Sequence, residues 1–204
     1  MNKFRSLYDN YTFPPVDNYV IPENVGNNVL VDIGGCKGEF TENNRNKFSE
    51  CFIFEASYEN ASHINKTILE KNWTNTAVFN LAVSDKTGQI LKLYQNESDR
   101  GSGSTIGGST HQEKHTNVYS IAFNDILNFL DIKNIDLLKI DCEGAEHIFL
   151  PTSDLESVDV ICLELHDWEG YSDNVVNIEN HILKTHTLIH TKGGGHKLQT
   201  YKRK

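Results

Sequence analysis

The chain has 204 residues, enough for one domain with a full-sized core. Its formal net charge is -9, which argues against a general nucleic-acid binder because phosphate backbones require clustered Lys and Arg. No run approaches the roughly 18 apolar residues of a membrane helix, and residues 1–19 lack the apolar segment of a signal peptide. We therefore expect a cytoplasmic protein that binds neither nucleic acid nor membrane, and we leave its oligomeric state open.

Apolar and polar stretches alternate along the chain as strands and helices do. We expect an irregular N-terminal arm over 1–28 and a single domain over 29–204. The expected strands cover 29–33, 51–55, 77–83, 89–94, 135–140, 158–165, 187–190 and 198–201, with 77–83 and 89–94 forming a hairpin. The expected helices cover 39–48, 58–71 (with Ser57 as N-cap), 121–130, 145–150 and 175–184. This alternation predicts an α/β fold with a mainly parallel sheet.

Local composition also characterises a Gly- and Ser-rich segment and the four cysteines. Residues 95–117 are dense in Gly and Ser, which indicates a flexible loop, and we interpret it as a lid over a substrate. Three of the four cysteines (Cys51, Cys142 and Cys162) lie in apolar runs, and none forms a C-x-x-C pair with another. We expect reduced, buried thiols rather than disulfides or a zinc site.

The most informative local pattern begins with the apolar strand 29–33. Gly34, Gly35 and Gly38 follow it and allow a sharp turn with close approach of the backbone to a ligand. A strand, a glycine turn and a helix in this order are typical of nucleotide-binding folds. The dinucleotide pattern G-x-G-x-x-G is not met, because Cys36 and Glu39 occupy the later glycine positions, and there is no G-x-x-x-x-G-K-[ST] loop.

Two acidic residues narrow the choice of nucleotide. Asp32 lies just before the turn, where it would repel a pyrophosphate but suit an amino group or a positive charge. Glu55 ends the next strand, where a carboxylate can accept hydrogen bonds from both hydroxyls of a ribose. S-adenosylmethionine carries an α-amino group, a sulfonium and a ribose, and no phosphate. Either acid alone could be an ordinary polar residue at a strand end, but the pair beside these glycines predicts S-adenosylmethionine as cofactor.

Four ordered segments resemble the motifs of the FkbM family of S-adenosylmethionine-dependent methyltransferases: 31–41, 54–56, 80–88 and 137–146. The most distinctive is Lys139-Ile140-Asp141-Cys142-Glu143-Gly144-Ala145-Glu146. The resemblance implies a class I Rossmann-like fold, whose seven-stranded sheet has an antiparallel last strand. It also implies methylation of oxygen, commonly a hydroxyl of a sugar or natural product. The chain departs from the family at Gly35-Cys36-Lys37, where Ala-Asn-hydrophobic is usual, and at Phe123-Asn124-Asp125, where Leu-Asp is usual.

Ligands of open α/β sheets bind beyond the carboxyl ends of the strands. This rule predicts the cofactor contacts, which we assign to Asp32, Gly34, Gly35, Gly38, Glu55, Ala82, Val83, Asp85 and Asp141. Asp85, or the backbone at Ala82 and Val83, would meet the adenine edge. An equally good interpretation of Asp85 is that it serves the turn that follows.

A hydroxyl acceptor benefits from a general base, for which His166 and Asp141 are the candidates. His166 has the better-matched ordinary pKa. Asp141 could instead hold the methionine part of the cofactor or orient His166, and Glu143 is a weaker third candidate. A divalent metal on Asp141, Glu143, His166 and Asp167 is the rival use of this cluster. The resemblance does not require one, so we predict no metal.

The fourth parallel strand ends with Asp141-Cys142-Glu143-Gly144 and lacks the Asp/Asn-Pro-Pro-aromatic pattern that grips a planar amine. We therefore expect an S-adenosylmethionine-dependent O-methyltransferase acting on a small-molecule or glycan hydroxyl. One alternative is a catalytically silent protein that binds S-adenosylmethionine. Another is a nicotinamide-dependent oxidoreductase.

Overall fold

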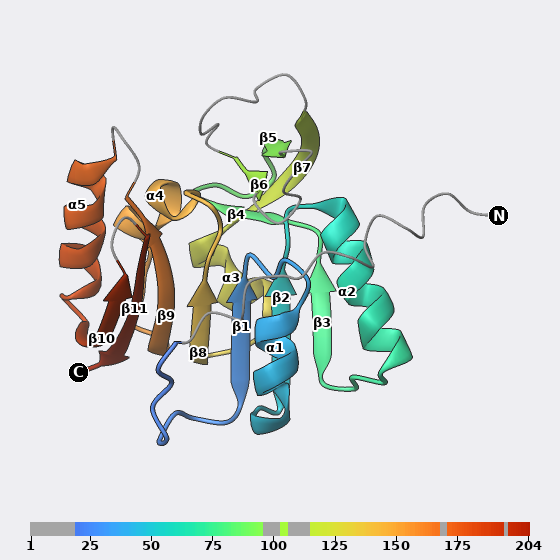
Figure 1. Ribbon diagram of the computed structural model, residues 1–204, viewed down its shortest axis with the longest axis horizontal. Coiled ribbons are helices and arrows are strands. Elements are labelled where there is room, and N and C mark those ends of the chain that lie inside the picture. Colours follow the sequence, from blue (N-terminus) through green and yellow to red (C-terminus); the bar gives the residue numbers. More distant parts are fainter. Residues whose placement is uncertain (1–18, 96–102, 106–114, 168–170, 194–195) are drawn as a thin grey trace.

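The computed structural model describes residues 19–95, 103–105, 115–167, 171–193 and 196–204 (Figure 1). Most of the predicted lid and of the predicted N-terminal arm lie outside these ranges. Within them, Tyr19, Ile21 and Val25 pack against the core beside Phe40 of the first helix. No helix in the described ranges is both long and apolar enough to cross a membrane.

A seven-stranded sheet with the order β10-β11-β9-β8-β1-β2-β3 forms the centre of the molecule. Its strands are β1 (Val29–Ile33), β2 (Glu50–Phe54), β3 (Thr76–Phe79), β8 (Ile135–Ile140), β9 (Val158–His166), β10 (His186–Gly193) and β11 (His196–Arg203). The first five pair in parallel, whereas β11 runs antiparallel to both β9 and β10. The predicted α/β class and the antiparallel last strand are confirmed.

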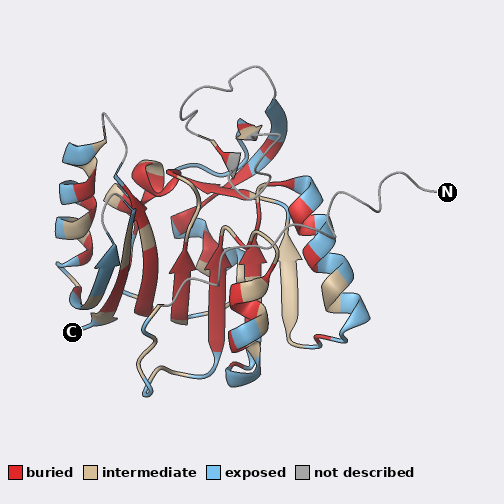
Figure 2. Cartoon of the chain, viewed as in Figure 1, coloured by how far each residue is buried: buried red, intermediate tan, exposed pale blue. Residues whose placement is uncertain are grey.

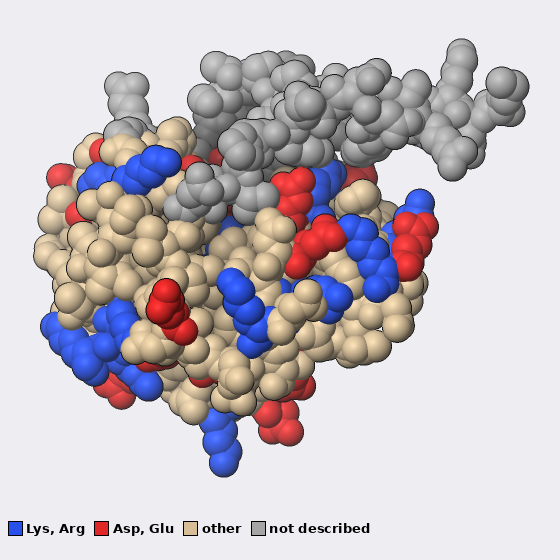
Figure 3. Space-filling model, turned by 60° about the horizontal axis from the view of Figure 1, so that its bottom comes forward, with Lys and Arg blue, Asp and Glu red and all other residues tan. Residues whose placement is uncertain are grey.

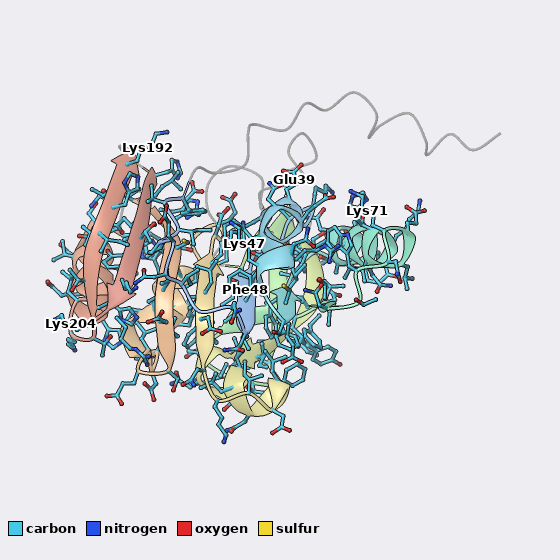
Figure 4. All side chains as sticks on the ribbon, turned by 90° about the horizontal axis from the view of Figure 1, so that it is seen from below. Glu39, Lys47, Phe48, Lys71, Lys192 and Lys204 are labelled. Carbon is cyan, nitrogen blue, oxygen red and sulfur yellow. The ribbon has the colours of Figure 1, made fainter. Side chains whose placement is uncertain are left out.

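Helices cover both faces of this sheet. They are α1 (Glu39–Asn44), α2 (Tyr58–Glu70), α3 (Ile126–Leu130), α4 (Glu146–Phe149) and α5 (Ser172–Ile182). Figure 4 places Glu39 of α1 and Lys71, which follows α2, on one side of the sheet and α3 on the other. The predicted N-cap is confirmed, because the Ser57 hydroxyl accepts from the backbone N–H of Asn60 at 3.4 Å.

The core consists of two apolar layers on either side of the central strands. One layer lies toward α1 and includes Leu30, Leu137 and Val160, all fully buried. The other, larger layer lies toward α3 and α5 and includes Ile140 and Ile178. Every residue of β1 is buried, as expected for a parallel strand covered on both faces, whereas the outer faces of α2 and α5 are exposed (Figure 2).

A second, smaller sheet has the order β4-β7-β5-β6 and lies beyond the end to which the parallel strands point (Figure 1). Its strands are β4 (Ala82–Ser84), β5 (Ile90–Gln95), β6 (Gly103–Ser104) and β7 (His115–Ala122). The predicted hairpin between 77–83 and 89–94 is wrong, because β5 pairs antiparallel with β7 while β4 pairs parallel with β7.

Two of the predicted element boundaries are also corrected here. The single strand expected over 77–83 is divided, because Asn80 turns away and donates its amide to the backbone oxygens of Glu55 and Ala56. The helix expected over 121–130 begins at Phe123, with a 3-10 turn (Phe123–Asp125) that leads into α3, since Ile121 and Ala122 end strand β7. An apolar run of this length fits a buried strand end and a helix face equally well.

Candidate active site at the carboxyl edge of the sheet

The glycine turn after β1 passes tightly beneath the loop after β8. Gly34 has φ +79°, and a Cβ on it would lie 1.7 Å from the backbone oxygen of Asp141. A Cβ on Gly35 would lie 2.2 Å from the side chain of Ile53. Gly38 is the N-cap residue of α1. The turn therefore has no room for side chains at its first two positions, and it brings two predicted site residues, Gly34 and Asp141, into contact.

Asp32 lies beneath this turn with no exposed surface. Its Oδ2 accepts from the hydroxyl of Thr41 at 2.8 Å, and its Oδ1 is 3.3 Å from Nζ of Lys139. Nζ of Lys139 also donates to the backbone oxygen of Gly34 at 2.6 Å. These contacts join β1, α1 and β8 under the turn, so we reassign Asp32 from direct contact with a ligand to support of the turn.

Lys139 is a buried cation that sequence reasoning did not single out as a site residue. Its Nζ is near two carboxylates, 3.3 Å from Oδ1 of Asp32 and 3.7 Å from Oδ2 of Asp141. Burial acts to lower the pKa of Lys139, but the two carboxylates outweigh burial and raise it above its ordinary value. The amine is therefore charged, and it ties the turn to the start of the loop after β8.

Glu55 follows β2 and closes the same turn from the other side. Its Oε2 accepts from the backbone N–H of Cys36 at 2.8 Å, and its Oε1 accepts from that of Ser57 at 2.7 Å. Burial raises the pKa of Glu55 to about 7, although both N–H donors and Lys139 act to lower it. The carboxylate thus lies beside the glycine turn, as predicted, with lone pairs remaining for further donors.

The predicted adenine residues lie on and after β4. Ala82 and Val83 are buried, and they pair with Ser120 and Ile121 of β7. Asp85 is exposed and accepts from the hydroxyl of Ser84 at 3.3 Å. Since β4 is an edge strand of the small sheet, its outer backbone edge pairs with no other strand in the described part of the chain.

In the loop after β8, the backbone turns so that the side chain of Glu146 accepts hydrogen bonds from the loop itself. Glu143 and Gly144 both have positive φ, +53° and +92°. This turn lets Oε2 of Glu146 accept from the N–H of Gly144 at 2.9 Å and from the thiol of Cys142 at 3.4 Å. Glu146 is fully buried at the start of α4. Like Lys139, it belongs to the distinctive motif block, but nothing in the sequence distinguished it from a solvated helix residue.

His166 ends β9 with its ring enclosed by acidic side chains. Its Nδ1 is 2.7 Å from Oε1 of Glu146, while its Nε2 is 3.6 Å from Oε2 of Glu143 and 3.9 Å from Oε1 of Glu164. Burial acts to lower the pKa of His166, but Glu146 above all, and then Glu143 and Asp141, raise it to about 9. The acidic neighbours therefore favour the protonated form of the ring.

Two overlapping groups of side chains have the composition of metal sites. The first is Asp141, Glu143 and His166, and the second is Glu164, His166 and His196; within each group the candidate ligand atoms lie within 4.8 Å of one another. The structure thus brings the two predicted catalytic residues, Asp141 and His166, together. Asp167, the remaining member of the rival metal set, instead accepts from the hydroxyl of Ser172 at 2.9 Å.

Solved structures with a similar fold include methyltransferases. A methyltransferase FkbM from Methylobacillus flagellatus KT matches with a TM-score of 0.51 at 13% identity, over 86% of this chain and 43% of that one. A putative rRNA methylase from Clostridium thermocellum matches with a TM-score of 0.51 at 9% identity, over 86% of each chain. An rRNA methylase from Streptococcus thermophilus matches with a TM-score of 0.50 at 9% identity, over 87% of each. Together with the strand order, these similarities define a class I Rossmann-like methyltransferase fold.

The family follows from the sequence itself. Residues 32–190, most of the chain, match the methyltransferase FkbM domain. The protein belongs to the FkbM methyltransferase family, and the resemblance of its motifs is confirmed. The comparison with curated proteins finds no match.

Proposed function

We propose that the protein is an S-adenosylmethionine-dependent O-methyltransferase. The observation that carries this proposal is the buried carboxylate of Glu55, held between two backbone N–H groups beside the glycine turn. A carboxylate at this place would accept from ribose hydroxyls, and no phosphate-binding motif accompanies it. Membership of a methyltransferase family supports the same cofactor.

Bound S-adenosylmethionine supplies a methyl group already activated by its sulfonium. The chain's own task is to align the acceptor oxygen with that carbon, to exclude water and to take up the hydroxyl proton. The small sheet lies over the carboxyl edge, where it would help to exclude water (Figure 1). Contact between Gly34 and the backbone of Asp141 would keep the cofactor site and the base adjacent.

We assign the base to Asp141 rather than to His166. The side chain of Asp141 is 22% exposed, whereas that of His166 is 2% exposed and faces the carboxylates of Glu143 and Glu164. A base must reach the acceptor hydroxyl directly or through one water, and a well-placed base contributes about 10²–10⁴-fold. The greater exposure of the Asp141 side chain supports this assignment.

The acceptor that we propose is a hydroxyl of a sugar, glycan or natural-product-like molecule. The sequence after β8 lacks the Pro-Pro-aromatic pattern of enzymes that methylate planar amines. The net charge of -9 supports a small acceptor over a nucleic acid. On the face shown in Figure 3, which is turned away from the carboxyl edge of the sheet, Lys and Arg lie interspersed with Asp and Glu.

Cofactor binding tests the first step of this proposal. S-adenosylhomocysteine should raise the melting temperature of the protein, and NAD should not. Glu55→Gln should weaken S-adenosylhomocysteine binding by at least about tenfold, as expected for the loss of a charged hydrogen-bond acceptor. Glu70→Gln, on the exposed side of α2, should not change it. A shift with NAD alone would overturn the assignment.

Turnover tests the second step. Release of S-adenosylhomocysteine from S-adenosylmethionine would be followed with a panel of saccharides and polyols, and with an RNA oligonucleotide as a separate arm. We expect turnover with a hydroxyl acceptor, lowered by about 10²–10⁴-fold in Asp141→Asn. Turnover with RNA alone would replace the proposed acceptor class, and undiminished turnover in Asp141→Asn would remove that residue as the base.

A further inference from the structure

Strands β9 and β11 bring three potential metal ligands onto one face of the main sheet. In their antiparallel register His196 lies opposite His166, and Leu198 lies opposite Glu164. Residues two apart on a strand, and residues directly opposite across a strand pair, share a face. Glu164, His166 and His196 therefore project from the same side, and the two imidazole rings meet edge to face at 4.9 Å.

The distances between their ligand atoms approach those of a coordination sphere. Oε1 of Glu164 is 3.9 Å from Nε2 of His166 and 4.0 Å from Nδ1 of His196, and Oε2 of Glu143 is 3.6 Å from the same Nε2. Ligands bound at about 2.0–2.1 Å in a tetrahedral zinc site are about 3.4 Å apart. Since the His196 side chain is 57% exposed, a small rotation of this side chain would bring its Nδ1 from 4.0 Å to the separation expected between two zinc ligands.

The ring of His166 is fixed in the orientation that such a site requires. Its Nδ1 is 2.7 Å from Oε1 of the fully buried carboxylate of Glu146, and the same oxygen accepts from the backbone N–H of His166 at 3.1 Å. An ionised carboxylate only accepts, so Nδ1 donates and Nε2 is directed at Glu143 and Glu164. A carboxylate that holds the second nitrogen of a ligating histidine is a recurrent outer partner of metal sites.

The charge around this point also favours a cation. Carboxylates of Glu143, Glu146 and Glu164 all lie within 4 Å of a ring nitrogen of His166. Two imidazoles and carboxylates suit zinc and its neighbours, whereas magnesium prefers oxygen ligands and keeps several waters.

We propose that Glu164, His166 and His196, with Glu143 as a fourth ligand, bind one divalent transition-metal ion of the zinc class at the carboxyl end of β9. The alternative group of Asp141, Glu143 and His166 uses the same Nε2, so one chain holds one ion. The group of Glu164, His166 and His196 has two histidines and the alternative group has one, so we place the ion between β9 and β11. This proposal goes beyond the methyl-transfer function and does not depend on the acceptor.

Metal titration of untagged protein, stripped with a chelator and dialysed, tests the site. We expect calorimetry to show one Zn²⁺ or Co²⁺ bound per chain, and Mg²⁺ to bind at least about a hundredfold more weakly. Bound Co²⁺ should give the visible absorption that is typical of a low coordination number with nitrogen and oxygen ligands. His196→Ala should weaken Zn²⁺ binding by at least about tenfold, as should Glu164→Gln. His190→Ala, a histidine on β10 outside the cluster, is the matched control and should bind as the wild type.

The same variants distinguish failure of this proposal from failure of the proposed function. His196→Ala should bind S-adenosylhomocysteine within about twofold of the wild type, because His196 lies outside the cofactor site. Absence of stoichiometric Zn²⁺ and Co²⁺ binding, or binding undiminished in both cluster variants, would overturn the metal site and leave the methyltransferase proposal standing. Binding lost equally in His190→Ala would overturn it as well.

Discussion

Glu146 holds His166 by two hydrogen bonds to one oxygen: its Oε1 is 3.1 Å from the backbone N and 2.7 Å from Nδ1 of the ring. The other oxygen of the same carboxylate accepts from the backbone of Gly144 and the thiol of Cys142. A single buried side chain therefore connects the loop after β8 to the end of β9. The proposed base and three of the four proposed metal ligands come from these two segments, whereas His196 comes from β11.

Replacing this carboxylate should cost more stability than replacing an exposed one. Glu146→Gln leaves the buried His166 ring without its charged partner and sets an amide group against N–H donors, so we expect the free energy of unfolding to fall by roughly 3 kcal/mol. Glu70→Gln breaks an exposed pair with Lys66 and should cost less than about 0.5 kcal/mol. Urea unfolding measures both, and equal losses would contradict a structural role for Glu146.

Glycine at position 34 is required by space as well as by conformation, and Gly88 provides the control. Both have φ near +80°, but a Cβ at Gly88 meets nothing within 4 Å, whereas one at Gly34 meets the backbone of Asp141. We expect Gly88→Ala to cost about 1–2 kcal/mol from the left-handed conformation alone. Gly34→Ala should cost several kcal/mol and abolish S-adenosylhomocysteine binding. Similar unfolding curves for the two variants would show that the close approach is unimportant.

The features that could be predicted from the sequence are those set by nearby residues. The apolar run of β1, the glycines after it, Ser57 as an N-cap and Glu55 at the end of β2 each depend on a few consecutive positions. The motif block after β8 adds a longer pattern, and it identified the family. Local chemistry and a distinctive motif were sufficient for the fold class and for the family.

The features that could not be predicted depend on strand register and long-range pairing. Asp32 looked like a ligand-facing acid, because only the register of β1 against β8 reveals Lys139 opposite it. His196 lies 30 positions from His166, and the antiparallel register of β11 alone brings the two together. The small sheet was not predicted because β4 and β5 both pair with β7 rather than with each other. Strand β7 itself was not recognised, since its apolar end looks in sequence like the apolar start of a helix.

The ion pair under the glycine turn should show strong coupling. Lys139→Met leaves Asp32 buried without its cation, so we expect a loss of about 3–5 kcal/mol in the free energy of unfolding. Asp32→Asn should cost less, because Lys139 keeps Asp141 and the backbone oxygen of Gly34 as partners. The double variant should recover roughly 1–3 kcal/mol relative to the sum of the single losses. Simple additivity in urea unfolding would refute a direct interaction.

The raised pKa of Glu55 predicts a pH dependence of cofactor binding. Burial holds this pKa at about 7, so part of the free protein carries a protonated Glu55 below neutral pH. Ribose hydroxyls donate to the ionised carboxylate, so binding favours the deprotonated form and must release the proton when it is present. The affinity for S-adenosylhomocysteine should therefore fall as the pH drops below 7, by up to about tenfold per pH unit, and should level off above 7.

Calorimetry in two buffers of different ionisation enthalpy measures the number of protons released on binding, which tests the ionisation of Glu55 independently. At pH 6 the wild-type protein should release close to one proton on binding S-adenosylhomocysteine, because the carboxyl group with a pKa of about 7 is then mostly protonated in the free state. Glu55→Gln cannot ionise, so its weaker binding should release no proton and should not vary with pH between 5 and 8. His63→Gln, whose imidazole lies on α2 and has a lowered pKa because of burial, is the control and should retain the wild-type profile. If the wild-type affinity were flat across this range, the carboxylate of Glu55 would not be the group that receives the ribose.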